Sequence, residues 1–420
     1  SDRLFRNSKR TRSRTEEISA KCRLINMMNI ASLVLFLFFV PQESPTQREE
    51  RIGKRIESIR GLPFQKPLVL RKGSRKEYAR LALQDAKRLY GEDLNAAESF
   101  LKAFGLIPKG LGLAIAITAQ APIGVQLYYK NGEIALVDSK TDDDTLLAKM
   151  TTGLLDQHWP RQDRQENAGV NFDAQVALNA VRNGDSDLVK NMKWKDKKGE
   201  EKMPEDFLPG MIRATEEWER KDSRFKSLIV PRIFVRFSGF PYRRGTIFVE
   251  SLRQKKGWAG VNRAQENPPL STEQILHPEK YLAGENPVII GTDSLQSFLR
   301  KEGYRFVYRT TLGEFGTAVF FETHDKNLDS APLASGWGGD TALVFEKNGE
   351  KIHLWLTVWD TEPDAVEFRK ALLAISRKQL PKEAQLTTVV VRRGKACAWL
   401  GRYPMAIQNG LVDSLWESTC

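Results

Sequence analysis

Glu273 and His277 stand four residues apart in a stretch that the sequence predicts to be a short helix. This spacing places both side chains on one face of the helix. A carboxylate and an imidazole so arranged fit a pair of metal ligands or an acid–base couple. They also fit a capped helix whose histidine bonds to backbone. We prefer that second interpretation, because a lone His/Glu pair lacks the further ligands of a metal centre.

Histidine and cysteine are scarce in the 420-residue chain, which has three cysteines without a CxxC spacing. Its four histidines are His158, His277, His324 and His353. A histidine-rich metal centre and a Cys/His zinc site are therefore excluded. A disulfide between Cys397 and Cys420 is permitted but not indicated. We expect His158 to be structural, at the end of its helix.

The net charge of +12 does not indicate nucleic-acid binding. Residues 1–26 hold eight Lys/Arg against three Asp/Glu, so this segment alone contributes +5. Elsewhere basic and acidic residues alternate, as in KDKKGEEK at 195–202, which is typical of a solvated loop. We therefore expect no nucleic-acid partner.

The first sixty residues precede the predicted fold. Residues 1–26 form a basic upstream segment, and residues 27–43 have the basic flank and short apolar run of a signal peptide or signal anchor. The apolar run is shorter than the roughly 20 residues of a membrane span. We expect an exported protein (periplasmic, cell-envelope or extracellular), with membrane contact only through residues 29–40 if they are retained. Residues 44–60 are predicted to be a linker running into a helix.

The region 61–225 is predicted to be helical with one hairpin. Periodic apolar residues predict helices over 75–91, 92–108 and 110–123, the last of them buried. Asn131-Gly132 predicts a hairpin over 125–138. Asp142, Asp143 and Asp144 then suit the start of a helix that contains LLAKMTTGLLDQHW, residues 146–159. A further helix is predicted over 172–189.

The region 226–420 is predicted to be α+β. Its first part, from about residue 225, shows a mixed strand and loop pattern. Ser271 and Gln274 predict a capping box, and Pro278 limits the helix that follows. The last part predicts a hairpin around Asn348-Gly349, a helix over 363–379 and another hairpin over 387–401, which together form a β-β-α-β-β layer.

The stretch 146–159 is to be compared with the active-site helix of a zinc peptidase. A zinc peptidase of the His-Glu-x-x-His type needs two histidines four apart on one helix and a glutamate that takes a proton from zinc-bound water. A third ligand comes from a following helix. The end of the stretch, LLDQHW, is typical of such a helix, whereas its start has neither histidine nor glutamate.

The chain resembles a group of bacterial zinc metallopeptidases related to the thermolysin-like zincins, whose signature helix reads approximately HELTHALQDQHF. The resemblance runs from about residue 55 to 375, with matching stretches in the same order. They are IRGLPFQKP, YYKNG, ALNAVRNGD, FPYRRGTIFVESL, GWAGVN, PPLSTEQILHPEKYL, LGEFG, GWGGD and WDTEPDAVEF. The resemblance implies a zincin-like α+β fold in which a hairpin lines the cleft beside the active-site helix.

Laid on the family pattern without a gap, the helix lacks every group that holds or uses zinc. Ala148 and Thr152 stand at the two histidine positions, Lys149 stands at the general base, and Asn183 stands at the third ligand. Alanine has no donor atom, and neutral oxygens are poor zinc ligands. An ammonium at Lys149 disfavours a dication. We expect no metal, no cofactor and no catalytic residue here. Lys149 should point outward and Leu146, Leu147, Met150 and Leu154 toward the core.

The sequence therefore predicts a catalytically inactive metallopeptidase-like protein, not an enzyme, that binds a peptide or protein in the former cleft. The candidate cleft residues are Tyr128, Tyr129, Asp156, Gln157, Glu273 and His277. Asp156 and Gln157 should bond neighbouring loops. One alternative is a hydrolase with residual or relocated chemistry around Glu273, His277 and Lys149, and another is a structural, envelope-associated protein. The sequence specifies neither the partner nor an oligomeric state.

Three clusters of tryptophan with glycine or aspartate suggest either sugar stacking or core anchors. They are GWAG at 257–260, GWGGD at 336–340 and VWD at 358–360. Tryptophan beside glycine is more often buried under a tight turn. We expect core anchors.

Overall fold

The computed structural model describes residues 43–120, 125–138, 140–160, 171–192, 194–195, 201–222, 230–379, 390–391, 396–402 and 405–419. Contacts divide the chain into a unit of residues 1–52 and a unit of residues 53–420. The predicted basic and signal segments up to residue 42 lie outside the described residues, as do Cys420 and its permitted disulfide. No helix in the described part of the chain has the length and hydropathy that crossing a membrane requires.

The first helices follow the predicted order, with two corrections. The helix α2 already begins at Pro45 and ends at Arg60, so most of the expected linker is helical. Next come α3 (Arg75–Tyr90), α4 (Leu94–Ala103) and α5 (Leu113–Gln120). The prediction that α5 is buried is wrong in part, because the side chain of Ile115 is 70% exposed. Only one side of this short apolar helix packs, through Leu113 and Ala116.

A three-stranded sheet contains the predicted hairpin. Its strands are β1 (Val69–Lys72), β2 (Leu127–Lys130) and β3 (Glu133–Leu136), in the order β1-β3-β2. Asn131 and Gly132 have φ values of 48° and 86°, as a tight turn between β2 and β3 requires. In this sheet β3 pairs on both sides, and β2 is an edge strand.

The stretch 146–159 forms most of α6 (Asp143–His158), as predicted. Asp142 caps it by accepting a hydrogen bond from the backbone N–H of Thr145 at 2.8 Å. The expected core residues Leu146, Leu147, Met150 and Leu154 are all buried. The next long helix, α8 (Phe172–Asn191), packs against α6 and is buried over most of its length.

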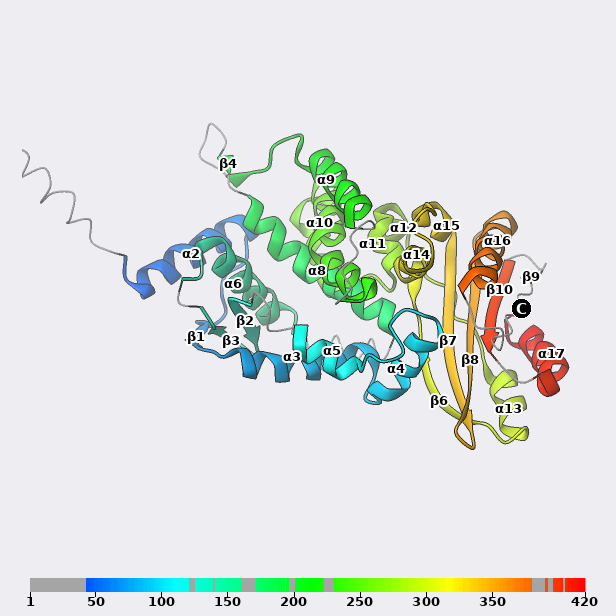
Figure 1. Ribbon diagram of the computed structural model, residues 1–420. Helices are drawn as coiled ribbons and strands as arrows, with labels where there is room; N and C mark the ends of the chain where they lie inside the picture. Colours follow the sequence, from blue (N-terminus) through cyan, green and yellow to red (C-terminus); the bar gives the residue numbers. More distant parts are fainter. Residues whose placement is uncertain are drawn as a thin grey trace, which may run out of the picture. The chain divides into compact units, whose positions relative to one another are not determined.

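Residues 232–266 are helical apart from a kink at Gly257, so the predicted strand and loop pattern is wrong there. The small pair β4 (Trp194–Lys195) and β5 (Glu201–Lys202) precedes α9 (Phe207–Asp222) and α10 (Arg232–Glu266). Aromatic and β-branched residues favour strands locally. Packing overrides that preference: α10 lies along α8, with Gly184 and Gly245 at the point of closest approach (Figure 1).

Three short helices lead from α10 to the second sheet: α11 (Thr272–Leu276), α12 (Pro278–Ala283) and α13 (Asp293–Lys301). Two more, α14 (Gly313–His324) and α15 (Ser330–Ala334), follow the first strand of that sheet. Ser271 caps α11 as predicted, because its Oγ accepts from the N–H of Gln274 at 3.2 Å. The Gln274 side chain accepts from the N–H of Leu270.

The C-terminal part confirms the α+β class and the predicted β-β-α-β-β order. The strands β6 (Arg305–Thr310), β7 (Trp337–Lys347), β8 (Glu350–Trp359), β9 (Val390–Val391) and β10 (Ala396–Arg402) form one sheet in the order β6-β7-β8-β10-β9. The helix α16 (Glu362–Gln379) separates the two hairpins, and η1 (Met405–Ile407) and α17 (Gln408–Thr419) end the described chain (Figure 1).

Helices cover this sheet on both faces, because its side chains alternate. Leu343, Leu354 and Leu356 share one apolar cluster with residues of α13 and α17. Trp355, on the other face, packs on Phe320 of α14 and Phe368 of α16, with ring centroids 5.2 and 5.6 Å away. The sheet is thus the core of the C-terminal part.

The prediction of core anchors is confirmed for the tryptophans of two clusters, whereas Trp258 of the third is partly exposed. Trp337 and Trp359 are fully buried. The Asp340 carboxylate accepts from the indole N–H of Trp337 and of Trp355, and from the backbone N–H of Leu312 and Gly313, over 2.8 to 3.1 Å. One buried carboxylate therefore joins the sheet to the start of α14.

Candidate functional site

The positions at which the resemblance would place zinc ligands lie where α6 faces α8. Ala148, Thr152 and Asn183 are all partly exposed. The Thr152 hydroxyl lies 3.1 Å from that of Ser186, which is three residues beyond Asn183 on α8. It also donates to the carbonyl of Ala148, and the Asn183 amide donates to the carbonyl of Asn179. These side chains are used in contacts within and between the two helices.

Gln157 bonds a neighbouring loop, as predicted, whereas Asp156 bonds Tyr129 of β2 and Arg182 of α8 instead. The Gln157 side chain accepts from the backbone N–H of Gln65 at 2.8 Å and donates to the carbonyl of Lys66. The imidazole of His158 lies 2.9 Å from the carbonyl of Pro63. The end of α6 therefore holds residues 63–66 in place, and His158 has a structural role.

The two candidate tyrosines do not line one cleft, because neighbouring residues of a strand point to opposite faces. Tyr129 donates a hydrogen bond to the Asp156 carboxylate at 2.7 Å, which ties β2 to α6. Tyr128 is buried on the other face, with its ring 5.3 Å from that of Tyr78. The prediction that both tyrosines belong to the cleft is therefore wrong for Tyr128.

A buried ion pair lies behind α8 at the same level. Arg60 Nε is 3.0 Å from Asp185 Oδ1, and both side chains are fully buried. Gln265 donates to the same carboxylate, and the guanidinium of Arg60 lies 4.2 Å from the ring centre of Trp258. Burial raises the pKa of Asp185, and Arg60 opposes that shift. Stretches far apart in the sequence thus meet at one structural contact.

His277 lines a pocket of about 740 Å³ and pairs with a buried glutamate. Its Nε2 is 3.0 Å from Oε1 of Glu314, at the start of α14. Glu314 is 5% exposed, and its second oxygen is buried without a hydrogen-bond partner among the described residues. The hydrogen bond with Glu314 raises the pKa of His277, and burial raises the pKa of Glu314.

Glu273 belongs to a separate cluster around one lysine. The Lys280 ammonium lies 2.6 Å from Glu273, 2.8 Å from Asp360 and 3.0 Å from Glu285. Burial raises the pKa of Glu273 to about 7 although Lys280 favours its charged form. These three carboxylates have the spacing of a cation site, and the ammonium of Lys280 supplies the positive charge at its centre.

Glu273 and His277 therefore do not form the pair that their spacing allowed as an alternative. The helix α11 ends at Leu276, and His277 has φ −122° and ψ 78°, so the four-residue spacing does not place both side chains on one helical face. The predicted bond from His277 to backbone is also replaced by its contact with Glu314.

Lys149 takes part in no hydrogen bond or ion pair resolved among the described residues. No local pattern in the sequence identified Glu314, Lys280 or Asp360 as partners, since they lie up to 87 positions from Glu273.

Comparison with known proteins covers only the C-terminal sheet region. A family described as a domain of unknown function (DUF8575) matches residues 304–401. No curated protein and no solved structure matches the chain. The matched segment contains β6, β7 and β8, together with Glu314 and Asp360.

Proposed function

We propose that the chain is a catalytically inactive, zincin-like member of the metallopeptidase family that it resembles. The observation behind this proposal is the contact between Thr152 and Ser186, one turn beyond Asn183. It supports the assignment because the helices that would supply the zinc ligands face each other at those positions. The side chains there are an alanine and two neutral groups, which are poor substitutes for imidazole and carboxylate.

The retained function is binding of a peptide or protein. The strand β2 supports this proposal, since it is an edge strand beside α6 and is linked to it through Tyr129 and Asp156. An exposed strand edge binds an extended peptide by main-chain hydrogen bonds without any catalytic group. Export, with residues 29–40 as signal or anchor, belongs to the same proposal.

Zinc content and proteolysis test the loss of catalysis together. The purified full-length chain, dialysed against zinc and then against buffer, should retain far less than one zinc per chain and should not cleave casein. Stoichiometric zinc, or casein cleavage that a chelator abolishes, would contradict the proposal. Peptide binding is tested separately by hydrogen–deuterium exchange. The backbone N–H groups of Leu127 and Tyr129 point away from β3, because the hydrogen-bonded pairs of this hairpin alternate with them, and a peptide added to this edge should slow their exchange.

A second candidate function rests on the pair of His277 and Glu314. An imidazole bonded to a buried carboxylate beside a pocket is an arrangement that acid–base catalysis uses. It would make the chain a hydrolase whose chemistry has moved from α6. A screen of ester, amide and glycoside substrates tests it: an activity that His277→Ala removes supports the hydrolase, and an activity unchanged by that substitution excludes this site.

A further inference from the structure

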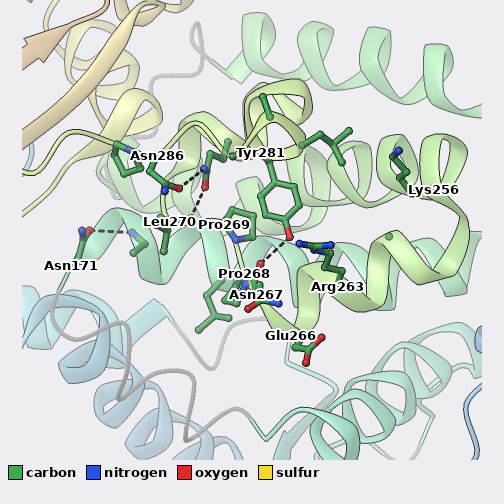
Figure 2. A pocket seen from close by; sticks show the side chains of 18 of the residues that line it. Asn171, Lys256, Arg263, Glu266, Asn267, Pro268, Pro269, Leu270, Tyr281 and Asn286 are labelled. Atoms are coloured by element: carbon green, nitrogen blue, oxygen red, sulfur yellow. Dashed lines mark hydrogen bonds between the residues drawn. The ribbon is translucent and has the colours of Figure 1, made fainter.

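A groove on the other side of α8 is independent of the lost zinc site. It has a volume of about 1220 Å³ and is open to solvent. Its walls are the start of α8, the end of α10 and the segment 267–289 (Figure 2). This volume exceeds that of common small-molecule pockets, which measure roughly 300 to 1,000 Å³. An open groove of this size suits an extended chain.

The rim of the groove concentrates exposed apolar side chains. Leu270, Leu282 and Ile289 are 49%, 39% and 88% exposed. They are three of the seven large apolar side chains that are exposed in the described part of the chain. Apolar groups gathered at one concave surface indicate a binding site more strongly than isolated ones do.

The groove is held open by hydrogen bonds between its walls. The Gln274 side chain accepts from the N–H of Leu270 and donates to the carbonyl of Glu285, so it joins the two loops beneath the groove. The Tyr281 hydroxyl donates to the carbonyl of Asn267 at 2.9 Å. Figure 2 shows the bond between Tyr281 and Asn267 beside Pro268. A surface fixed in this way loses little entropy when a ligand binds.

The charged and polar side chains of the groove indicate which kind of ligand it binds. Two cations, Lys256 and Arg263, line the groove against one acid, Glu266. Neither cation forms an ion pair among the described residues, and Figure 2 shows Arg263 beside the Tyr281 hydroxyl. A guanidinium without a partner binds a carboxylate through two parallel hydrogen bonds. The exposed side-chain amide of Asn267 adds a donor and an acceptor for a peptide backbone.

We propose that this groove binds an extended peptide segment of a partner protein that presents apolar side chains beside an acidic one. Leu270, Leu282 and Ile289 contact the apolar side chains, and Arg263 pairs with the carboxylate. The proposal does not depend on the loss of zinc. Its test measures peptide binding, and the result does not depend on whether the chain holds a metal ion.

Fluorescence anisotropy with the full-length chain tests the groove. The probes are labelled, C-terminally amidated dodecapeptides that alternate leucine and serine and differ only in a central Glu, Gln or Lys. We expect saturable binding of the Glu peptide and at least tenfold weaker binding of the Lys peptide. Arg263→Glu should reverse this preference, and Ile289→Ser should weaken binding of the Glu peptide at least fivefold. The matched control is Ile115→Ser, because Ile115 is 70% exposed on α5 outside the groove.

Three results would overturn the proposal. The first is no saturable binding of the Glu peptide, or binding that neither Arg263→Glu nor Ile289→Ser changes. The second is a dimer in sedimentation that Ile289→Ser dissociates, which would assign the groove to a second copy of the chain. The third is binding to vesicles of anionic phospholipid that requires Arg263 while the peptides stay unbound, which would assign it to a membrane surface.

Discussion

The side-chain hydroxyls of Thr152 and Ser186 lie 3.1 Å apart and join α6 to α8 at the level of Asn183. In a zinc peptidase of the His-Glu-x-x-His type, ligands from two helices must converge on one metal ion. The contact shows that side chains from these two helices reach one another at the corresponding positions.

Introducing the zincin ligands should create a zinc site. The variant Ala148→His, Lys149→Glu, Thr152→His, Asn183→Glu should bind zinc at one ion per chain, because two imidazoles and a carboxylate replace groups with little affinity for it. Metal analysis after dialysis measures this gain, and Asn183→Glu alone is the control that should bind none. A folded quadruple variant without zinc would show that the two helices do not have zincin geometry.

The crossing of α8 and α10 should not tolerate a methyl group. A Cβ atom at Gly184 would lie 2.3 Å from the backbone of Gly245. Gly184→Ala should therefore lower the free energy of unfolding by about 3 kcal/mol, measured by chemical denaturation. Gly210→Ala in α9 is the control, since no atom lies within 4 Å of its added Cβ, and it should leave stability unchanged or slightly higher. Equal effects at both positions would exclude close packing as the cause.

Removing the Asp340 carboxylate should destabilise the sheet region. Asp340→Ala leaves two indole and two backbone N–H groups without their acceptor. We expect a loss of about 4 kcal/mol, because unsatisfied buried donors are costly. Asp138→Ala, at an exposed carboxylate that accepts one backbone N–H, should cost less than about 0.5 kcal/mol. Similar losses for both would contradict a central role for Asp340.

Replacing Lys280 should convert its cluster into a cation site. Lys280→Met leaves three carboxylates near one another, and we expect it to lower stability by about 2 to 3 kcal/mol through their uncompensated repulsion. Calcium should restore part of this loss by taking the place of the ammonium. Thermal melting with and without calcium measures both effects. Lys87→Met, which removes an exposed pair with Glu92, should be nearly neutral and insensitive to calcium.

Stability should fall as pH rises from about 5 to 8. The folded-state pKa values of Glu273, His277 and Glu314 are all raised, and that of Glu273 is about 7. At these three groups the folded chain therefore holds more protons than the unfolded chain in this range, and the stability that the protons contribute at low pH is lost as they leave. Glu314→Gln should flatten the decline in melting temperature, whereas Glu92→Gln, at an exposed carboxylate, should not. A decline that is the same in both variants would exclude Glu314 as a cause.

Local signals in the sequence predicted the parts of the fold that local interactions decide. Asp142 starts α6 through a hydrogen bond within three residues, and Asn131-Gly132 supplies the backbone angles of its own turn. The helix α10 could not be predicted in this way. Its aromatic and β-branched residues favour strands, and its conformation depends on a backbone contact between Gly245 and Gly184, sixty-one positions earlier.

The difference between local and long-range interactions also decides which parts of the candidate site could be predicted. That Ala148, Thr152 and Asn183 lie near one another could be predicted from their positions on two neighbouring helices. The partners of Glu273 and His277 did not, because Asp360 and Glu314 come from other elements of the fold. Spacing along the chain predicts neighbours only while the helix continues, and here it ends at Leu276.

The segment 304–401 depends on contacts with residues that lie outside it in the chain. At the start of α14, the N–H of Phe315 donates to the hydroxyl of Thr272, and the Asp173 carboxyl group occupies the space where a side chain at position 313 would be. The carbonyl of Thr311 accepts from the N–H of Asp173. A fragment cut at residue 304 would lose these partners and expose the end of α14 to solvent. In this chain the matched domain therefore depends on residues that precede it by more than a hundred positions.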